Sequence, residues 1–147
     1  MVSFDISDVI LKTRQNNDSV QVYDPVRRAW VSLTPEEHVR QVVIQALIAN
    51  YEYPMSMFSV EKRIMVNKME KRYDAVIYGK NLEPWMLIEC KAPSIDINSS
   101  VLHQTANYYK TVNCPYILLT IGTYIQCGKR QVGGNLLWLA TLPTYDL

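Results

Sequence analysis

Three charged side chains interrupt two strand-like runs in the middle of this 147-residue chain, and they constrain its fold more than any other feature. β-Branched and aromatic residues fill the runs 72–78 and 85–94, and glycine, asparagine and proline mark the turn between them. Asp74 belongs to the first run, and Glu89 and Lys91 belong to the second. A buried sheet does not accept these charges without compensation, so they either pair with one another or bind something.

The second run has two different faces if it forms a strand. Side chains alternate along a strand, which predicts one face with Leu87, Glu89 and Lys91 and an opposite face with Ile88 and Cys90. The charged groups would then share a face, and Cys90 would lie in the core.

The length and composition are typical of one globular domain. With 147 residues, 48% hydrophobic and 20% charged, the chain fits one domain better than two. We assign residues 1–33 to an N-terminal extension with a strand hairpin and residues 34–140 to the core of a single domain, 1–147. The first residues lack a signal peptide and no apolar run approaches the ~20 residues that span a bilayer, so we expect a cytoplasmic protein without membrane contact.

The three cysteines are expected to be reduced and structural. Cys90, Cys114 and Cys127 are odd in number and lack CxxC spacing, which favours neither a disulfide framework nor a zinc site. A thiol nucleophile at Cys90 with His38 or His103 as its base is the alternative. Strand alternation disfavours it, because Cys90 turns away from the charged face, and both histidines are expected to be solvated.

A strong helix start precedes the central runs. Thr34 is predicted as the N-cap, Pro35 as the first helical residue and Glu37 as the residue that completes a capping box. The helix is predicted to run to about Ala49, with a buried face of Val39, Val42, Val43, Ala46 and Leu47. By this periodicity Glu36 projects near the buried face without a local explanation, whereas capping accounts for Glu37.

The remaining patterns complete an α/β fold. In the extension we predict a polar loop over 13–19 and hairpin strands over 20–23 and 27–31. After the first helix we predict, in order, a strand over 57–66, a charged turn over 67–71, the two central strands, a helix over 99–111, a buried strand over 115–120 and a strand pair over 124–127 and 136–140. This order predicts a mixed sheet flanked by helices, with an αβββαβ core and a C-terminal strand pair.

An Asp on one strand, followed 15 residues later by Glu-x-Lys on the next, suits metal-assisted hydrolysis of a phosphodiester. Two carboxylates supply hard oxygen ligands for Mg²⁺ or Mn²⁺. A lysine beside them positions a water nucleophile or neutralises charge that develops on the phosphate.

With these elements the sequence resembles the PD-(D/E)XK nuclease superfamily, and within it the N-terminal nuclease domain of type I restriction enzyme R subunits. The resemblance covers roughly residues 20–140. It is carried by residues 33–41, Arg72-Tyr73-Asp74, Ile88-Glu89-Cys90-Lys91-Ala92-Pro93, and Gln104-Thr105-Ala106-Asn107-Tyr108, which fits the QxxxY motif of the RecB-like branch. It implies a restriction-endonuclease-like sheet. Tyr73-Asp74 stands where the superfamily has Pro-Asp.

The resemblance also implies roles for individual residues. Asp74 and Glu89 would bind the metal with help from the backbone carbonyl of Cys90, and Glu36 would reach it through water. Lys91 would orient the attacking water and stabilise the transition state. Gln104, with Tyr108 behind it, would position Lys91 or a phosphate.

Partners follow from the same resemblance. DNA is the expected substrate, and we expect a Mg²⁺-dependent endodeoxyribonuclease domain. R subunits continue into a DNA-translocating motor that this sequence does not contain, so ATP-driven restriction would need separately encoded motor or specificity subunits. A homodimer is plausible because enzymes that cut both strands often pair two sites.

Contact with DNA would need a local basic patch, and the alternative for the basic residues below is an ordinary solvated face. The net charge of +1 gives no global electrostatic signature. Glu61 and Glu70 interrupt a group of five basic residues that fall close together in the sequence: Lys62, Arg63, Lys68, Lys71 and Arg72. Arg27 and Arg28 are further candidates. The alternative to a nuclease is a catalytically inactive module of the same fold that binds nucleic acid or a partner protein.

Overall fold

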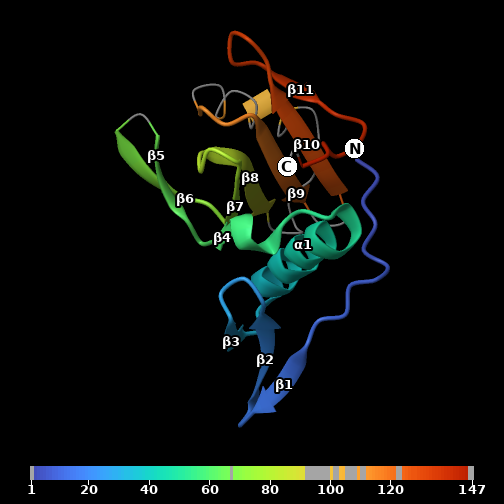
Figure 1. Ribbon diagram of the computed structural model, residues 1–147. Helices are drawn as coiled ribbons and strands as arrows, with labels where there is room; N and C mark the ends of the chain where they lie inside the picture. Colours follow the sequence, from blue (N-terminus) through green and yellow to red (C-terminus); the bar gives the residue numbers. More distant parts are fainter. Residues whose placement is uncertain are drawn as a thin grey trace.

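A six-stranded mixed sheet forms the centre of the protein in the computed structural model (Figure 1). The structure describes residues 2–66, 68–91, 100, 103, 104, 109, 112–121 and 124–145. The strand order is β11-β10-β9-β8-β7-β4. The bounds are β4 Phe58–Val60, β7 Ala75–Tyr78, β8 Pro84–Lys91, β9 Tyr116–Ile121, β10 Tyr124–Arg130 and β11 Leu136–Trp138.

The sheet is mixed because β8 and β9 run parallel, whereas every other neighbouring pair in it is antiparallel. Parallel neighbours require a crossover connection, and the segment between β8 and β9 supplies it. The predicted α/β class with a mixed sheet is therefore confirmed. The predicted helix over 99–111 lies largely outside the described residues, of which 100, 103, 104 and 109 are helical.

Helix α1, Pro35–Tyr51, begins as predicted. The Thr34 hydroxyl accepts a hydrogen bond from the Glu37 N–H at 3.1 Å, and Pro35 occupies the first turn. The helix ends at Glu52, whose left-handed backbone (φ 59°) lets its N–H reach the Leu47 carbonyl. No helix among the described residues is long and apolar enough to cross a membrane.

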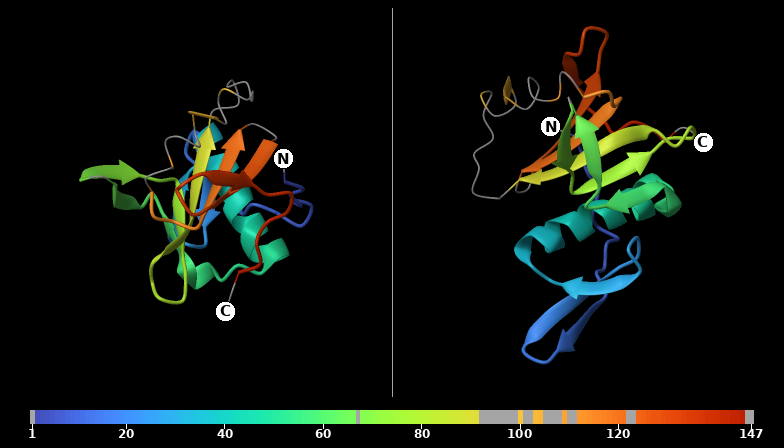
Figure 2. Two further views of the ribbon diagram at one scale, coloured as in Figure 1. Left: turned by 90° about the horizontal axis from the view of Figure 1, so that it is seen from above. Right: turned by 90° about the vertical axis from the view of Figure 1, so that its left-hand side faces the viewer.

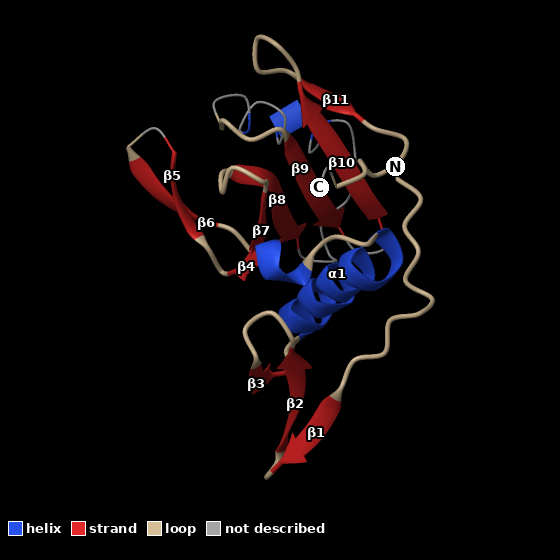
Figure 3. Cartoon of the chain, in the orientation of Figure 1, coloured by secondary structure: helices blue, strands red, loops and turns tan. Residues whose placement is uncertain are grey.

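A separate three-stranded sheet precedes α1 and lies on the other side of the helix from the six-stranded sheet (Figures 2 and 3). It contains β1 Thr13–Asn16, β2 Ser19–Asp24 and β3 Ala29–Ser32, in that order. The hairpin predicted over 20–23 and 27–31 is confirmed. The loop predicted over 13–19 is wrong for residues 13–16, because this polar segment pairs with β2 as an edge strand whose side chains are exposed.

A long bent hairpin replaces the predicted strand over 57–66 and the predicted turn over 67–71. After a short 3₁₀ turn, η1 Met55–Met57, strand β4 pairs with β7. Strands β5 Arg63–Val66 and β6 Met69–Arg72 pair with each other outside the main sheet. Glu61 adopts a left-handed backbone (φ 56°), and this bend divides the predicted strand in two.

The pairing is continuous through the bend. Val60 pairs with Ala75 and Arg63 pairs with Arg72, so the same register holds on both sides. The backbone hydrogen bond from Glu61 N–H to the Asp74 carbonyl (3.0 Å) joins the two halves. The charged segment 69–71 is therefore strand, because the pairing of β5 with β6 begins at Val66 and Met69.

The two faces of the sheet carry two apolar clusters. On one face Ile88 and Leu118 pack with α1 residues such as Ile44 and Leu47. On the other face Leu87 packs with Tyr73, Val76, Tyr109, Val112, Cys114 and Ile117. The predicted alternation of Leu87 and Ile88 is confirmed, and it places Glu89 on the face that lies away from α1.

Replacement of Leu118 by alanine is expected to destabilise the fold strongly. Leu118 is fully buried on the central strand β9, so truncation leaves a cavity and should cost about 2–5 kcal/mol of unfolding free energy. Urea denaturation followed by circular dichroism measures this. Leu137→Ala on edge strand β11 is the matched control, because Leu137 is 48% exposed and its loss should cost less than about 1 kcal/mol. Equal losses for both variants would contradict the assigned core.

Candidate functional site

Asp74 is joined to strand β8 by its side chain. It lies directly before β7, and its Oδ2 accepts a hydrogen bond from the Cys90 N–H at 2.7 Å. The β7–β8 pairing begins at Ala75 and Ile88, so the Asp74 carboxylate takes the next donor along β8 in place of a backbone carbonyl. The carboxylate therefore lies beside the backbone of the Glu89-Cys90-Lys91 segment at Cys90.

Glu89 and Lys91 occupy the end of β8. Glu89 is buried, and its Oε2 accepts a hydrogen bond from the Tyr109 hydroxyl. Lys91 is half-buried and forms no ion pair with any described residue. An internal pair between Glu89 and Lys91, the alternative to a binding site, is thus not formed.

Arg40 of α1 holds the other side of Asp74. Its guanidinium lies 3.1 Å from Asp74 Oδ1 and 3.3 Å from carboxylate oxygens of both Glu37 and Glu61. Arg40 and Glu37 are buried, and Asp74 and Glu61 are partly exposed. Three carboxylates therefore converge on one buried arginine.

The ion-pair network reaches from the extension to the projecting hairpin. Arg27 contacts both Asp24 and Glu37, the second at 2.6 Å, and so ties the turn after β2 to α1. At the other end Arg72 pairs with Glu61 at 2.5 Å. Burial acts to raise the pKa of the Glu61 carboxyl, but Arg72 and Arg40 outweigh it and hold that pKa below its usual value.

The expectation that Glu36 faces the interior is wrong. Glu36 is exposed and Glu37 is buried, with Gln41 donating to the Glu37 carboxylate at 3.1 Å. The buried face of α1 is rotated from the predicted one, because its first turns bury a paired polar set rather than apolar residues. The Glu37 N–H accordingly donates to the Thr34 cap, while the Glu37 carboxylate pairs with Arg27 and Arg40.

The remaining predicted residues are less closely placed. Gln104 is exposed, and no hydrogen bond joins it to Lys91 in the described part of the chain. Tyr108 lies outside the described residues, and its neighbour Tyr109 is the residue that contacts Glu89. The five basic residues of the predicted patch all lie on the β5–β6 hairpin or directly before it.

Two residues of the site were missed from the sequence, Arg40 and Glu61. A signal for Arg40 exists, because Glu37, Arg40 and Gln41 recur at i, i+3 and i+4 and so share a helix face. Glu61 has no comparable local signal, since the bend that directs it toward Arg40 depends on the hairpin.

The donor set fits a hard divalent cation. Asp74 and Glu89 offer carboxylate oxygens, which Mg²⁺ and Mn²⁺ prefer. Each Asp74 oxygen has one protein partner and keeps a second lone pair, and Glu89 Oε1 has no partner among the described residues. Among those residues no group of three or more His, Cys, Asp and Glu side chains gathers as a metal cage, so any cation here would also need backbone or water ligands.

The cysteines and histidines do not build a thiol site. Burial raises the pKa of the Cys90, Cys114 and Cys127 thiols to about 12. His38 and His103 are exposed, as expected. The thiolate needed for nucleophilic attack is therefore scarce near neutral pH.

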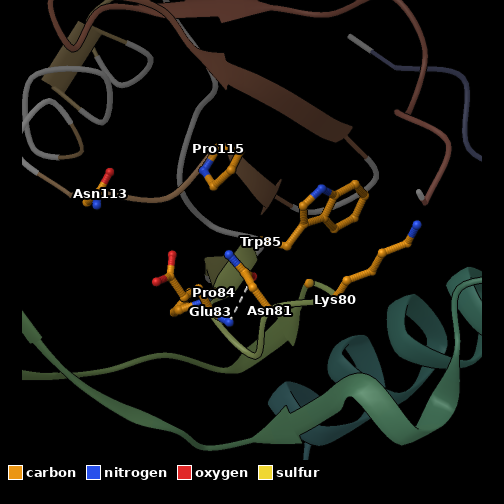
Figure 4. Close-up of a pocket in the computed structure, with 8 residues that line it drawn as sticks. Lys80, Asn81, Glu83, Pro84, Trp85, Asn113 and Pro115 are labelled. Carbon is orange, nitrogen blue, oxygen red and sulfur yellow. Dashed lines mark hydrogen bonds between the residues drawn. The ribbon is translucent and has the colours of Figure 1, made fainter. Parts of the chain in front are cut away.

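An open cleft of about 440 Å³ lies at the opposite end of β8 (Figure 4). Asn81 of the β7–β8 turn and Trp85 at the start of β8 line the cleft, and so do Asn113 and Pro115 before β9. From Pro84 to Glu89 the strand rises roughly 16 Å, so this cleft does not contain the carboxylates.

The fold is a mixed α/β domain in which Asp74 precedes β7 and Glu89 and Lys91 lie on the neighbouring strand β8. Residues 35–143 match the family model of the type I restriction enzyme R protein N terminus (HSDR_N), and the chain belongs to this family. The predicted family is therefore confirmed. A comparison with curated protein sequences gives no match.

A cryo-electron microscopy structure of a DrdV–DNA complex is among the similar solved structures. The identity is 16% and the TM-score is 0.48, over 71% of this chain. The chain spans about a tenth of the length of that protein, since the match covers 10% of it.

Removal of the buried guanidinium, in Arg40→Met, is expected to lower the unfolding free energy by about 3 kcal/mol, because it leaves carboxylates without their partner. Arg40→Lys should recover part of the loss by restoring the charge without the planar fork. Thermal and urea unfolding measure both. The control is Arg63→Met, whose exposed pair with Glu70 at 3.8 Å should be worth less than about 1 kcal/mol. An Arg40→Met variant with unchanged unfolding free energy would contradict a stabilising role for the ion-pair network.

The three thiols are expected to resist alkylation in the folded protein. With a pKa of about 12, each carries little thiolate at pH 8, and burial adds a steric barrier. Iodoacetamide labelling followed by mass spectrometry should modify them slowly in buffer and rapidly in urea. Fast labelling of native Cys90 at pH 8 would show that its surroundings are wrongly described.

Proposed function

We propose that this domain is a divalent-metal-dependent nuclease that hydrolyses phosphodiester bonds of DNA. The observation that carries the proposal is the 2.7 Å hydrogen bond from the Cys90 N–H to Asp74, which brings the Asp carboxylate to the Glu-x-Lys strand end. Membership in the R protein N-terminus family supports the same activity. The two acidic groups suit a cation. Lys91, which has no ion-pair partner among the described residues, suits contact with the charged ester.

Each residue has a distinct proposed task. Asp74 and Glu89, with the Cys90 carbonyl, would hold Mg²⁺ or Mn²⁺, which supplies a Lewis acid and lowers the pKa of water. Lys91 would orient the attacking water and offset the charge that builds on the phosphate oxygens. Tyr109 positions Glu89 by its hydrogen bond.

The contact between Arg40 and Asp74 favours a second candidate function. Because Arg40 neutralises Asp74 directly at 3.1 Å, the same geometry suits a module of this fold that binds DNA or a partner protein without cleavage. Metal binding separates the two candidates, because only the nuclease needs Asp74 to accept a cation.

For restriction driven by ATP, we propose that a motor and a specificity unit act together with this domain. A pair of domains would supply two sites for the two strands of DNA.

The nuclease proposal predicts cleavage of plasmid DNA in Mg²⁺ or Mn²⁺ and its loss in EDTA. Asp74→Ala should abolish cleavage, and Lys91→Ala should slow it by roughly 10²–10³-fold, the usual effect of removing one electrostatic stabiliser. Gel assays with supercoiled plasmid and with single-stranded DNA measure the rates.

The matched control is Lys129→Ala, an exposed lysine of β10 outside the site, which should cleave like the wild type. Calorimetric titration with Mn²⁺ is the second readout. Binding that disappears in Asp74→Ala supports the metal site. Cleavage no faster than that of Lys91→Ala, together with no Mn²⁺ binding, would refute the nuclease and favour the non-catalytic module.

A further inference from the structure

The β5–β6 hairpin projects from the body of the protein as a two-stranded arm (Figures 1 and 2). We call residues 62–72 the arm; its described residues are 62–66 and 68–72. Its strands pair with each other and with no other strand in the described structure. A two-stranded ribbon gains little stability for itself, although Ile64 of the arm packs against the buried cluster around Tyr73. The arm therefore needs an explanation other than completion of the core.

The arm carries excess positive charge. It contains Lys62, Arg63, Lys68, Lys71 and Arg72 against Glu70 alone, with Glu61 at its base. Arg63 and Arg72 stand directly opposite each other in the ribbon, with side chains 64% and 54% exposed. Like charges across a strand pair destabilise it, and here Glu61, 2.5 Å from Arg72, and Glu70, 3.8 Å from Arg63, offset part of that repulsion. The basic residues of the arm still outnumber the acidic ones, which suits contact with an anion.

Apolar side chains on the arm are also exposed. Met65 is 65% exposed and Met69 is 72% exposed, and the two lie toward the tip, beside Lys68 at the turn. Methionine is flexible and adapts to irregular surfaces. Basic groups can contact phosphates and flexible apolar groups can contact the walls of a nucleic-acid groove, so these side chains suit a groove better than they suit exposure to water.

The base of the arm is fixed against the carboxylates. Arg72 binds Glu61 at 2.5 Å, Glu61 lies 3.3 Å from Arg40, and Arg40 lies 3.1 Å from Asp74. The arm also returns to the body at Tyr73, the residue before Asp74. A phosphate held at the base of the arm would thus lie close to the proposed catalytic groups.

We propose that the arm grips double-stranded DNA by entering a groove of the duplex next to the cleavage site. The major groove of B-DNA is about 12 Å wide and admits a two-stranded β-ribbon, whereas a single strand offers no groove. This inference rests on the proposed function, because it names the surface by which the same domain would hold its DNA.

Charge reversal at the arm tests the proposal. Arg63→Glu combined with Lys68→Glu leaves the Arg72–Glu61 link intact. Binding of the full chain to a fluorescent 30-base-pair duplex is measured by anisotropy in Ca²⁺ at several salt concentrations. We expect a Kd roughly tenfold higher or more. We also expect the slope of log affinity against log salt to shrink by about two, one for each basic side chain that no longer neutralises a phosphate.

The control variant carries the same charge change elsewhere. Lys80→Glu combined with Lys129→Glu alters the β7–β8 turn and β10 and should change the Kd less than twofold. Circular dichroism melting confirms that both variants fold. Equal weakening by both variants would mean that total charge, not the arm, governs binding, and would overturn the proposal.

The outcome is separable from that of the nuclease proposal, because binding is measured without cleavage. A wild-type chain that binds the duplex through the arm but never cuts in Mg²⁺ would support the arm and refute the nuclease. Unchanged affinity after charge reversal of the arm would overturn the proposal that the arm binds DNA. The absence of duplex binding by the wild-type chain would overturn it as well. In the first case the exposed methionines would point to a protein partner.

Discussion

Asp74 is held from two sides, by the Cys90 N–H of β8 and by Arg40 of α1, and the rest of the structure depends on this junction. The first contact closes the β7–β8 ladder at the point where backbone pairing stops. The second fixes the helix over the end of the same strands. A carboxylate without these partners would be costly at a half-buried sheet edge, so the side chain that is proposed to act on substrate also joins the elements that carry it.

The charges around Arg40 favour one arrangement of the chain more than they favour stability. Taking an arginine and its carboxylates out of water costs several kcal/mol per ion, and close pairing returns much of that cost. The balance is sensitive to geometry, and Arg40 Nε is buried without a partner among the described residues. Through Arg27 the same network joins the N-terminal sheet to α1. Residues before position 33, predicted from the sequence to form an extension, therefore help to fix the surroundings of the site.

Much of the fold was predictable, because its signals are local. The N-cap at Thr34, the alternation of Leu87 and Ile88 and the hairpin strands of the N-terminal sheet follow from spacing of a few residues. The failures arise where distant residues decide. The period of the apolar helical face predicts that Glu36 is directed to the interior, whereas the buried polar set of α1 contains Glu37. The strand predicted over 57–66 divides because Glu61 turns toward Arg40 and Arg72, which only the folded hairpin brings near.

The unbroken register of the bent hairpin makes the arm separable from the site. Val60 opposite Ala75 and Arg63 opposite Arg72 belong to one ladder, and the left-handed residue at Glu61 changes its direction without inserting a residue. Residues can therefore be added or removed in matched pairs near the tip, and Asp74 keeps its place against β8. A change of one residue on one strand would reverse the faces of everything beyond it. The arm can thus change in length and tip chemistry without displacing Asp74 from β8, which makes it a natural position for grafting new recognition sequences.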